Sequence, residues 1–88
     1  MSDRDRTAIM EELKEALEHA SNGKAKLSRV SEEALIVDDL GLYSLDLLDL
    51  RYEVEERWNL RIDDEEIVAM KTVGDVIDVI LARRKPDA

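Results

Sequence analysis

The 88-residue sequence contains no cysteine and only one histidine, His19. The absence of cysteine excludes disulfides, thiol nucleophiles and thiolate metal ligands, and a single histidine cannot complete the usual ligand set of a zinc site. A chain of this length forms one small core with little room for an enclosed substrate cavity. We therefore expect a single domain over residues 1–88 that is not an enzyme and holds no metal.

The chain also lacks a long apolar run and an excess of positive charge. Residues 1–6 carry charges of both signs and lead into no signal peptide or membrane-spanning segment. The net charge of −9 argues against nucleic acid as a partner, because phosphate binding needs a cationic surface. We expect a cytoplasmic monomer without a membrane span, whose partners are basic.

The acidic residues are concentrated in one window. Residues 38–66 hold eleven acidic residues and three arginines, a net charge of −8. Such a charge run is often only a solvated face, so its position relative to other features must decide whether it has a further role. Because like charges repel, we expect salt or divalent cations to stabilise the fold.

Apolar residues recur at helical spacing over residues 6–20 and predict a first helix. Asn22 and Gly23 follow, and both accept the left-handed conformation that ends helices. Residues 24–43 then form a long irregular loop, and loops of this length in a small domain usually have a function. We expect apolar residues to anchor this loop to the core, namely Ala34, Leu35, Ile36, Val37 and Leu40.

Residues 44–58 are predicted to form a second helix with three faces, ending at Asn59. The stripe expected to face the core comprises Leu47, Leu50, Val54 and Trp58. The acidic face comprises Asp46, Asp49, Glu53 and Glu56. A second apolar stripe comprises Leu45, Leu48 and Tyr52. Either another helix covers this second stripe or it is a docking patch beside the acids, and we favour docking.

Two more helices complete a predicted all-α four-helix bundle. The acidic run 63–66 suits a helix N-terminus and opens a short third helix that extends to Met70. Thr72 is the predicted N-cap of the fourth helix, and Pro86 is its predicted stop. The expected buried side of this helix is Val73, Val76, Ile77 and Ile80, with Leu81 nearby. The basic residues at its C-terminal end are Arg83, Arg84 and Lys85.

The motif around Ser44 resembles the attachment signature of the acyl carrier protein family, the phosphopantetheine-binding carriers of fatty acid, polyketide and nonribosomal peptide pathways. The resemblance covers residues 38 to 80 and rests on Asp38-Asp39-Leu40-Gly41, Ser44-Leu45-Asp46 and residues 53–58, 62–66 and 72–75. It implies a four-helix bundle of acyl-carrier type, with a long loop between the first two helices and a short third helix.

By this resemblance Ser44 carries 4′-phosphopantetheine through a phosphodiester, and the thiol end of that arm holds an acyl group as a thioester. A helix N-terminus suits the phosphodiester anion, because it offers free N–H groups and the positive end of the helix dipole. A serine at such a place is more often a simple N-cap. However, position 47 is Leu, and not the Glu or Gln that a capping box would need.

The resemblance also implies that the protein performs no bond chemistry and presents its cargo to successive enzymes. The expected partners are a phosphopantetheinyl transferase, an acyl-loading ligase or acyltransferase, and ketosynthases with basic docking patches. The predicted partner-binding residues are Leu45, Asp46, Leu48, Asp49, Tyr52, Glu53 and Glu56. The acyl chain is expected to shelter between the helices, and the candidates, otherwise plain core, are Leu47, Leu50, Val54, Ile67, Met70, Val73 and Ile77.

One position departs from the family pattern. Members usually have Asp immediately before the modified serine, where it is thought to help the transferase hold magnesium, and this chain has Tyr43 there. Modification is therefore expected to be slower or to need a particular transferase. Arg51 also interrupts a commonly apolar face, which suggests a dedicated pathway. Two alternatives remain open: a peptidyl or aminoacyl carrier, and an unmodified helical adaptor with the same fold.

Overall fold

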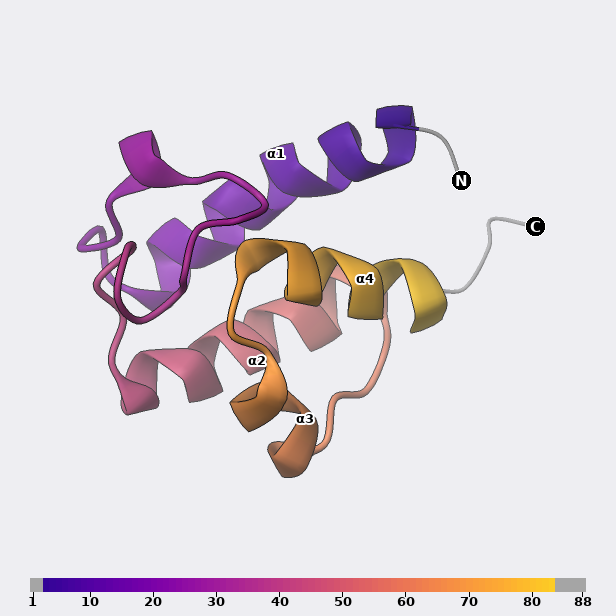
Figure 1. The fold of residues 1–88 in the computed structure, drawn as a ribbon. Coiled ribbons are helices and arrows are strands. Elements are labelled where there is room, and N and C mark those ends of the chain that lie inside the picture. Colours follow the sequence, from indigo (N-terminus) through magenta and orange to yellow (C-terminus); the bar gives the residue numbers. More distant parts are fainter. Residues whose placement is uncertain (1–2, 84–88) are drawn as a thin grey trace.

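Four α-helices and one 3-10 turn make up the part of the chain that the computed structural model describes, residues 3–83 (Figure 1). The elements are α1 (Asp3–Ala20), η1 (Leu27–Arg29), α2 (Ser44–Trp58), α3 (Asp64–Ala69) and α4 (Val73–Arg83). Within these residues there is no strand, and one isolated bridge pairs Leu35 with Thr72. The predicted all-α bundle with a long loop and a short third helix is confirmed.

The helix bounds agree with the periodicity except at the start of α1 and at the end of α3, which stops at Ala69 with Met70 as its C-cap. Helix α1 begins at Asp3, three residues before the predicted start, and aspartates in a first turn favour a helix start. The predicted stop at Pro86 lies outside the described residues, as do Arg84 and Lys85. No helix within residues 3–83 is long and apolar enough to span a membrane.

A left-handed turn ends α1 and directs the chain into the loop. Asn22 and Gly23 have φ values of 54° and 81°. The N–H of Gly23 donates to the carbonyl of Glu18 at 2.9 Å, and the N–H of Asn22 donates to that of His19 at 3.3 Å. These two bonds form the Schellman motif, so the predicted helix stop is confirmed.

The core lies where α1 packs against α2 and α4. The largest buried side chains that the helices contribute are Ile9, Leu13 and Leu17 of α1, Leu50 and Val54 of α2, and Val73, Val76, Ile77 and Ile80 of α4. Leu47 and Trp58, which were predicted to be core, are only half-buried and pack against its edge. Both lie at one margin of the apolar stripe of α2, so the helix presents them obliquely to its neighbours.

Alternate residues hold the long loop against the core. Ala34 and Ile36 are buried, whereas Leu35 and Val37 are exposed, so the prediction that all four anchor the loop is wrong for those two. Leu35 pairs with Thr72 in the isolated bridge, and successive side chains of an extended segment point to opposite sides. Further along the loop, the predicted anchor Leu40 is buried, and Leu42 is buried as well.

The loop also bonds to the start of α4. The N–H of Gly74 donates to the carbonyl of Glu32 at 2.9 Å, and the N–H of Val73 donates to that of Ala34 at 3.1 Å. A Cβ atom at Gly74 would lie 3.0 Å from the Glu32 carbonyl oxygen. Glycine therefore suits this close approach, because a Cβ atom would force the Glu32 carbonyl to move by a few tenths of an ångström.

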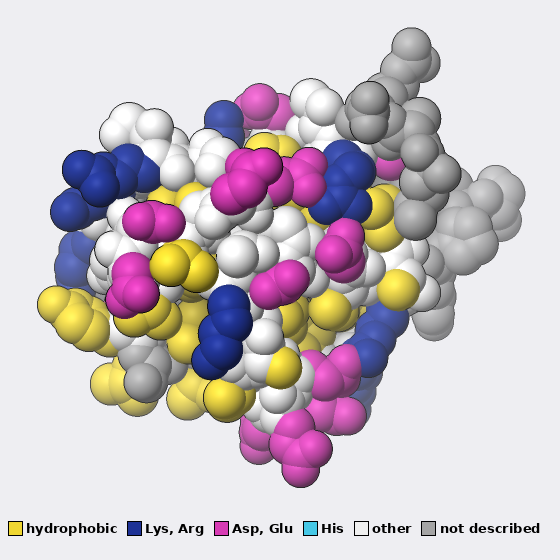
Figure 2. Space-filling model, viewed as in Figure 1, with side chains coloured by type: hydrophobic (Ala, Val, Ile, Leu, Met, Phe, Trp, Pro, Cys, Tyr) yellow, Lys and Arg dark blue, Asp and Glu magenta, His cyan; other side chains and the backbone are white. Residues whose placement is uncertain are grey.

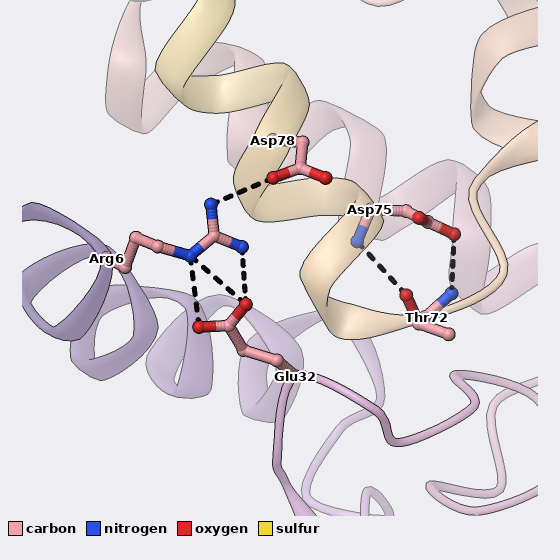
Figure 3. A network of polar contacts seen from close by, with 5 residues as sticks. All are labelled: Arg6, Glu32, Thr72, Asp75 and Asp78. Carbon is pink, nitrogen blue, oxygen red and sulfur yellow. Dashed lines mark hydrogen bonds and ion pairs between the residues drawn. The ribbon is translucent and has the colours of Figure 1, made fainter. Parts of the chain in front are cut away.

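Arg6 joins three elements that are far apart in the sequence (Figure 3). Its Nε atom lies 3.1 Å from each carboxylate oxygen of Glu32 in the loop, and its Nη1 atom donates to Asp78 of α4 at 2.9 Å. The guanidinium lowers the pKa of Glu32 by donating to its charged form. This ion-pair network ties α1, the loop and α4 together.

A reciprocal capping box begins α4 (Figure 3). The Thr72 hydroxyl accepts a hydrogen bond from the N–H of Asp75, and the Asp75 carboxylate accepts one from the N–H of Thr72, both at 3.1 Å. The carboxylate also accepts from the N–H of Lys71 at 3.0 Å. These backbone N–H groups, that of Thr72 first, lower the pKa of Asp75. The prediction that Thr72 caps the last helix is confirmed.

Candidate functional site

Ser44 is the first residue of α2, and the end of the loop determines where it lies. Gly41 turns the chain with a φ of 78°, and Leu42 is buried in the core. Tyr43 is extended, with φ −102° and ψ 174°. Because neighbouring side chains of an extended backbone point to opposite sides, the burial of Leu42 directs Tyr43 into solvent.

The backbone of Tyr43 and the carboxylate of Asp46 cap α2. Asp46 Oδ2 accepts a hydrogen bond from the N–H of Tyr43 at 2.9 Å, and the N–H of Leu47 donates to the Tyr43 carbonyl at 3.1 Å. Treating Ser44 as the N-cap is therefore wrong, because the cap is Tyr43. Counted from Tyr43, Asp46 is the third helical residue and supplies the carboxylate half of a capping box.

The first turn of α2 meets the requirements of a phosphodiester. The first N–H groups of a helix have no acceptor within it, and they lie at the positive end of the dipole of this 15-residue helix. The nearest acid, Asp46, is engaged with the N–H of Tyr43. The residues present therefore fit a phosphate group attached at Ser44.

The second apolar stripe of α2 faces solvent. Leu45, Leu48 and Tyr52 are all exposed, so the alternative that another helix covers them is wrong for the described structure. Val68 of α3 is exposed as well. Figure 2 shows hydrophobic side chains gathered at the lower left, which is the end of the molecule where α2 begins in Figure 1.

The four acids of the predicted acidic face of α2, namely Asp46, Asp49, Glu53 and Glu56, differ in what surrounds them. Glu53 accepts from Arg57 Nε at 3.3 Å and lies 3.9 Å from His19 Nδ1, and Asp46 caps the helix. Glu56 accepts only from the Tyr52 hydroxyl, at 3.4 Å. Asp49 is exposed, and its carboxylate forms no hydrogen bond or ion pair with any residue in the described range. Asp49 and Glu56 are therefore the acids most available to a partner.

Known proteins show where this chain belongs, although no protein-family model matches it. It is 40% identical to the acyl carrier protein of Wolinella succinogenes over 73 residues, which cover 83% of this chain and 93% of that protein. It is 37% identical to the acyl carrier protein of Coprothermobacter proteolyticus over 76 residues, 86% of this chain and 90% of that protein. The chain belongs to the acyl carrier protein family.

A third comparison extends the range of relatives. The chain is 35% identical to the meromycolate extension acyl carrier protein of Mycolicibacterium aurum over 63 residues, 69% of this chain and 65% of that protein. Family membership confirms the resemblance read from the sequence. Acyl carrier proteins are carriers and not catalysts, which agrees with the small core of this chain.

In this acyl carrier protein, two arginines hold the short α3 in place. Arg51 of α2 forms an ion pair with Asp64, and Arg83 of α4 forms one with Glu66. Arg83 Nη1 also donates to the carbonyl of Arg61 at 3.1 Å. Arg83 lowers the pKa of Glu66 because it donates to the charged carboxylate. Sequence reasoning treated Arg51 only as an interruption of a helix face.

Sequence reasoning also placed Tyr43 outside the predicted docking set. The structure shows it exposed next to Ser44, at the end of the apolar stripe. The alternation of Leu42 and Tyr43 could have indicated this, because one of two neighbours in an extended segment must face outward.

Proposed function

We propose that this acyl carrier protein carries acyl groups as thioesters on a 4′-phosphopantetheine arm attached to the Ser44 hydroxyl. The observation that carries the proposal is the place of Ser44, the first residue of α2, in a chain that matches acyl carrier proteins over 83% and 86% of its length. The arm supplies a flexible tether and a terminal thiol that forms the thioester. The names of the relatives favour an acyl cargo over a peptidyl one.

The residues around Ser44 position the attachment point. Leu40 and Leu42 anchor the end of the loop in the core, and the cap at Tyr43 fixes the start of α2. The N–H groups of the first turn would hold the phosphodiester. Ser44 would then present the arm at one end of the bundle, within reach of a transferase and of later enzymes.

The exposed part of α2 would be the docking face. Basic residues of a phosphopantetheinyl transferase, a loading ligase or acyltransferase, or a ketosynthase would meet Asp49 and Glu56 first, with Asp46 and Glu53 contributing less because they are engaged internally. Leu45, Leu48 and Tyr52 would add apolar contact. Electrostatic attraction of this kind raises association rates and orients partners without making the complex long-lived.

The core would shelter the acyl chain between visits to enzymes. Of the seven candidate residues, Leu50, Val54, Ile67, Met70, Val73 and Ile77 are buried in one cluster, and Leu47 packs against it. Their packing shows a plain core, so sheltering a chain would require the helices to separate slightly. We propose that the cargo belongs to a fatty acid, polyketide or specialised lipid pathway.

The test is the intact mass of the protein before and after incubation with coenzyme A, Mg²⁺ and a phosphopantetheinyl transferase. Wild type should gain one phosphopantetheine, and Ser44→Ala should gain none. Ser28→Ala is the matched control, since Ser28 is an exposed serine that lies in η1 and not at the start of a long helix, and this variant should be modified like wild type. Failure of wild type with several transferases would instead support an unmodified adaptor.

A further inference from the structure

The two most exposed large apolar side chains in the described part of the chain are the immediate neighbours of Ser44. Leu45 is 76% exposed and Tyr43 is 72% exposed. Single exposed apolar residues are common on protein surfaces and need no explanation. Here, however, the two directly precede and follow the proposed attachment residue in the sequence, so a group attached there would begin close to both.

The backbone of both Tyr43 and Leu45 is held by the capped start of α2. The N–H and carbonyl of Tyr43 are bonded to Asp46 Oδ2 and to the N–H of Leu47. The Tyr43 hydroxyl makes no hydrogen bond within residues 3–83. Leu45 belongs to the first turn of α2. An apolar ring, a free hydroxyl and an isobutyl group are thus held next to Ser44 without partners of their own.

We propose that Tyr43 and Leu45 form a surface on which the proximal part of the phosphopantetheine arm rests. This inference rests on the proposed function. Beyond its phosphate, the arm has a methylene carbon and then a carbon that bears two methyl groups, followed by a hydroxyl and the first amide. Apolar carbon therefore comes within a few bonds of Ser44, and the hydroxyl and amide follow within reach of a phenol.

Covalent attachment makes this contact favourable even if each interaction is weak. A tethered group meets its neighbours at an effective concentration in the millimolar range for a short linker. Covering the two methyl groups with an aromatic face and an isobutyl group removes apolar surface from water on both sides. An enzyme that docks on Leu45 would displace the arm from this surface, which couples docking to release of the arm.

The experiment uses holo protein loaded from coenzyme A labelled with carbon-13 in the two methyl groups, observed by NMR. In wild type, the methyl proton signals should lie upfield of their positions in free 4′-phosphopantetheine, because they lie over the ring of Tyr43. Free 4′-phosphopantetheine is the reference, since transfer from coenzyme A releases adenosine 3′,5′-bisphosphate. Tyr43→Ser should return them to the free positions, and Tyr43→Phe should keep most of the shift. Leu45→Ser should reduce the shift.

The matched control is Tyr52→Ser, which removes an exposed aromatic ring from the same helix at a distance from Ser44 and should leave the methyl signals unchanged. Methyl signals in wild type equal to those of free 4′-phosphopantetheine would overturn the inference, and so would an upfield shift that survives Tyr43→Ser. A holo protein with unshifted methyl groups leaves the proposed function intact. If the wild type gains no phosphopantetheine, the proposed function fails and this inference fails with it.

Discussion

At the residue scale, equal charges on α2 do not have equal surroundings. Asp49 and Glu53 lie one helical turn apart, yet the Glu53 carboxylate accepts a hydrogen bond from Arg57 and lies near His19, while the exposed Asp49 carboxylate has no such partner within residues 3–83. A carboxylate that already has a cationic neighbour attracts a second cation less. The acidic face should therefore attract a cationic partner more strongly at Asp49 than at Glu53.

We predict that Asp49→Asn weakens partner binding more than Glu53→Gln. The expected rise in KM for a phosphopantetheinyl transferase is roughly fivefold for Asp49→Asn, which corresponds to about 1 kcal/mol for an exposed charge pair. The difference from wild type should shrink at high ionic strength, because salt screens exposed charges. Equal effects of both substitutions, or an effect independent of salt, would contradict the prediction.

At the element scale, α3 depends on ionic contacts more than the other helices do. It has six residues, of which only Ile67 is buried. Isolated helices of this length are not stable in water, so contacts with α2 and α4 must hold it. Those contacts include the pairs that Arg51 and Arg83 form with Asp64 and Glu66.

We predict that Arg51→Gln loosens α3 and leaves the rest of the bundle unchanged. Amide hydrogen exchange should become faster in residues 64–70, because local opening of this helix costs less free energy without the ion pair. Arg57→Gln is the matched control, since Arg57 also lies on α2 but pairs with Glu15 and Glu53 and not with α3. Exchange in α3 that responds equally to both variants would argue against the pair.

The start of α4 gives a prediction about pH. Asp75→Ala removes the carboxylate half of the capping box and should lower the free energy of unfolding by about 1 kcal/mol at neutral pH. The pKa of Asp75 is lowered in the folded protein, so its stabilising effect is complete above the ordinary Asp pKa of about 3.9 and is lost as the pH falls through the lowered value.

Urea unfolding of wild type and Asp75→Ala, at neutral pH and at strongly acidic pH, measures this difference. The two proteins should differ at neutral pH and converge at acidic pH. Glu65→Ala is a suitable control, since Glu65 is exposed and forms no hydrogen bond or ion pair with the described residues. A constant difference between wild type and Asp75→Ala at both pH values would show that the cap does not depend on the charge.

At the scale of the whole molecule, two electrostatic effects oppose each other. The net charge of −9 favours expansion, whereas ion pairs such as that of Arg6 with Glu32 and Asp78 favour the folded state. Salt screens both. Because exposed ion pairs contribute little, the repulsion should dominate.

We therefore predict that the midpoint of thermal unfolding rises as sodium chloride is added, and rises further with a divalent cation at equal ionic strength. Circular dichroism at 222 nm follows the loss of helix in such a titration. A midpoint that stays flat or falls with salt would show that the ion pairs outweigh the repulsion.

The sequence by itself determined the helices, most of their ends and the family. Helical periodicity and helix-end residues such as Asn22 and Thr72 act over one or two turns of the chain. Because each of these signals affects only residues close to it in the sequence, the sequence alone is enough to interpret it. The start of α2 at Ser44 followed in the same way.

Only the tertiary structure decided which side chains meet across the bundle. The network of Arg6 joins residues 26 and 72 positions apart, and no local pattern encodes such a pairing. The outward direction of Leu35 depends on its bridge to Thr72. Asp49 has no cationic partner within residues 3–83 because Arg51 pairs with Asp64 and Arg57 pairs with Glu15. Contacts between distant segments arise only when the helices pack, and they determine which acids of the acidic face remain without a cationic neighbour.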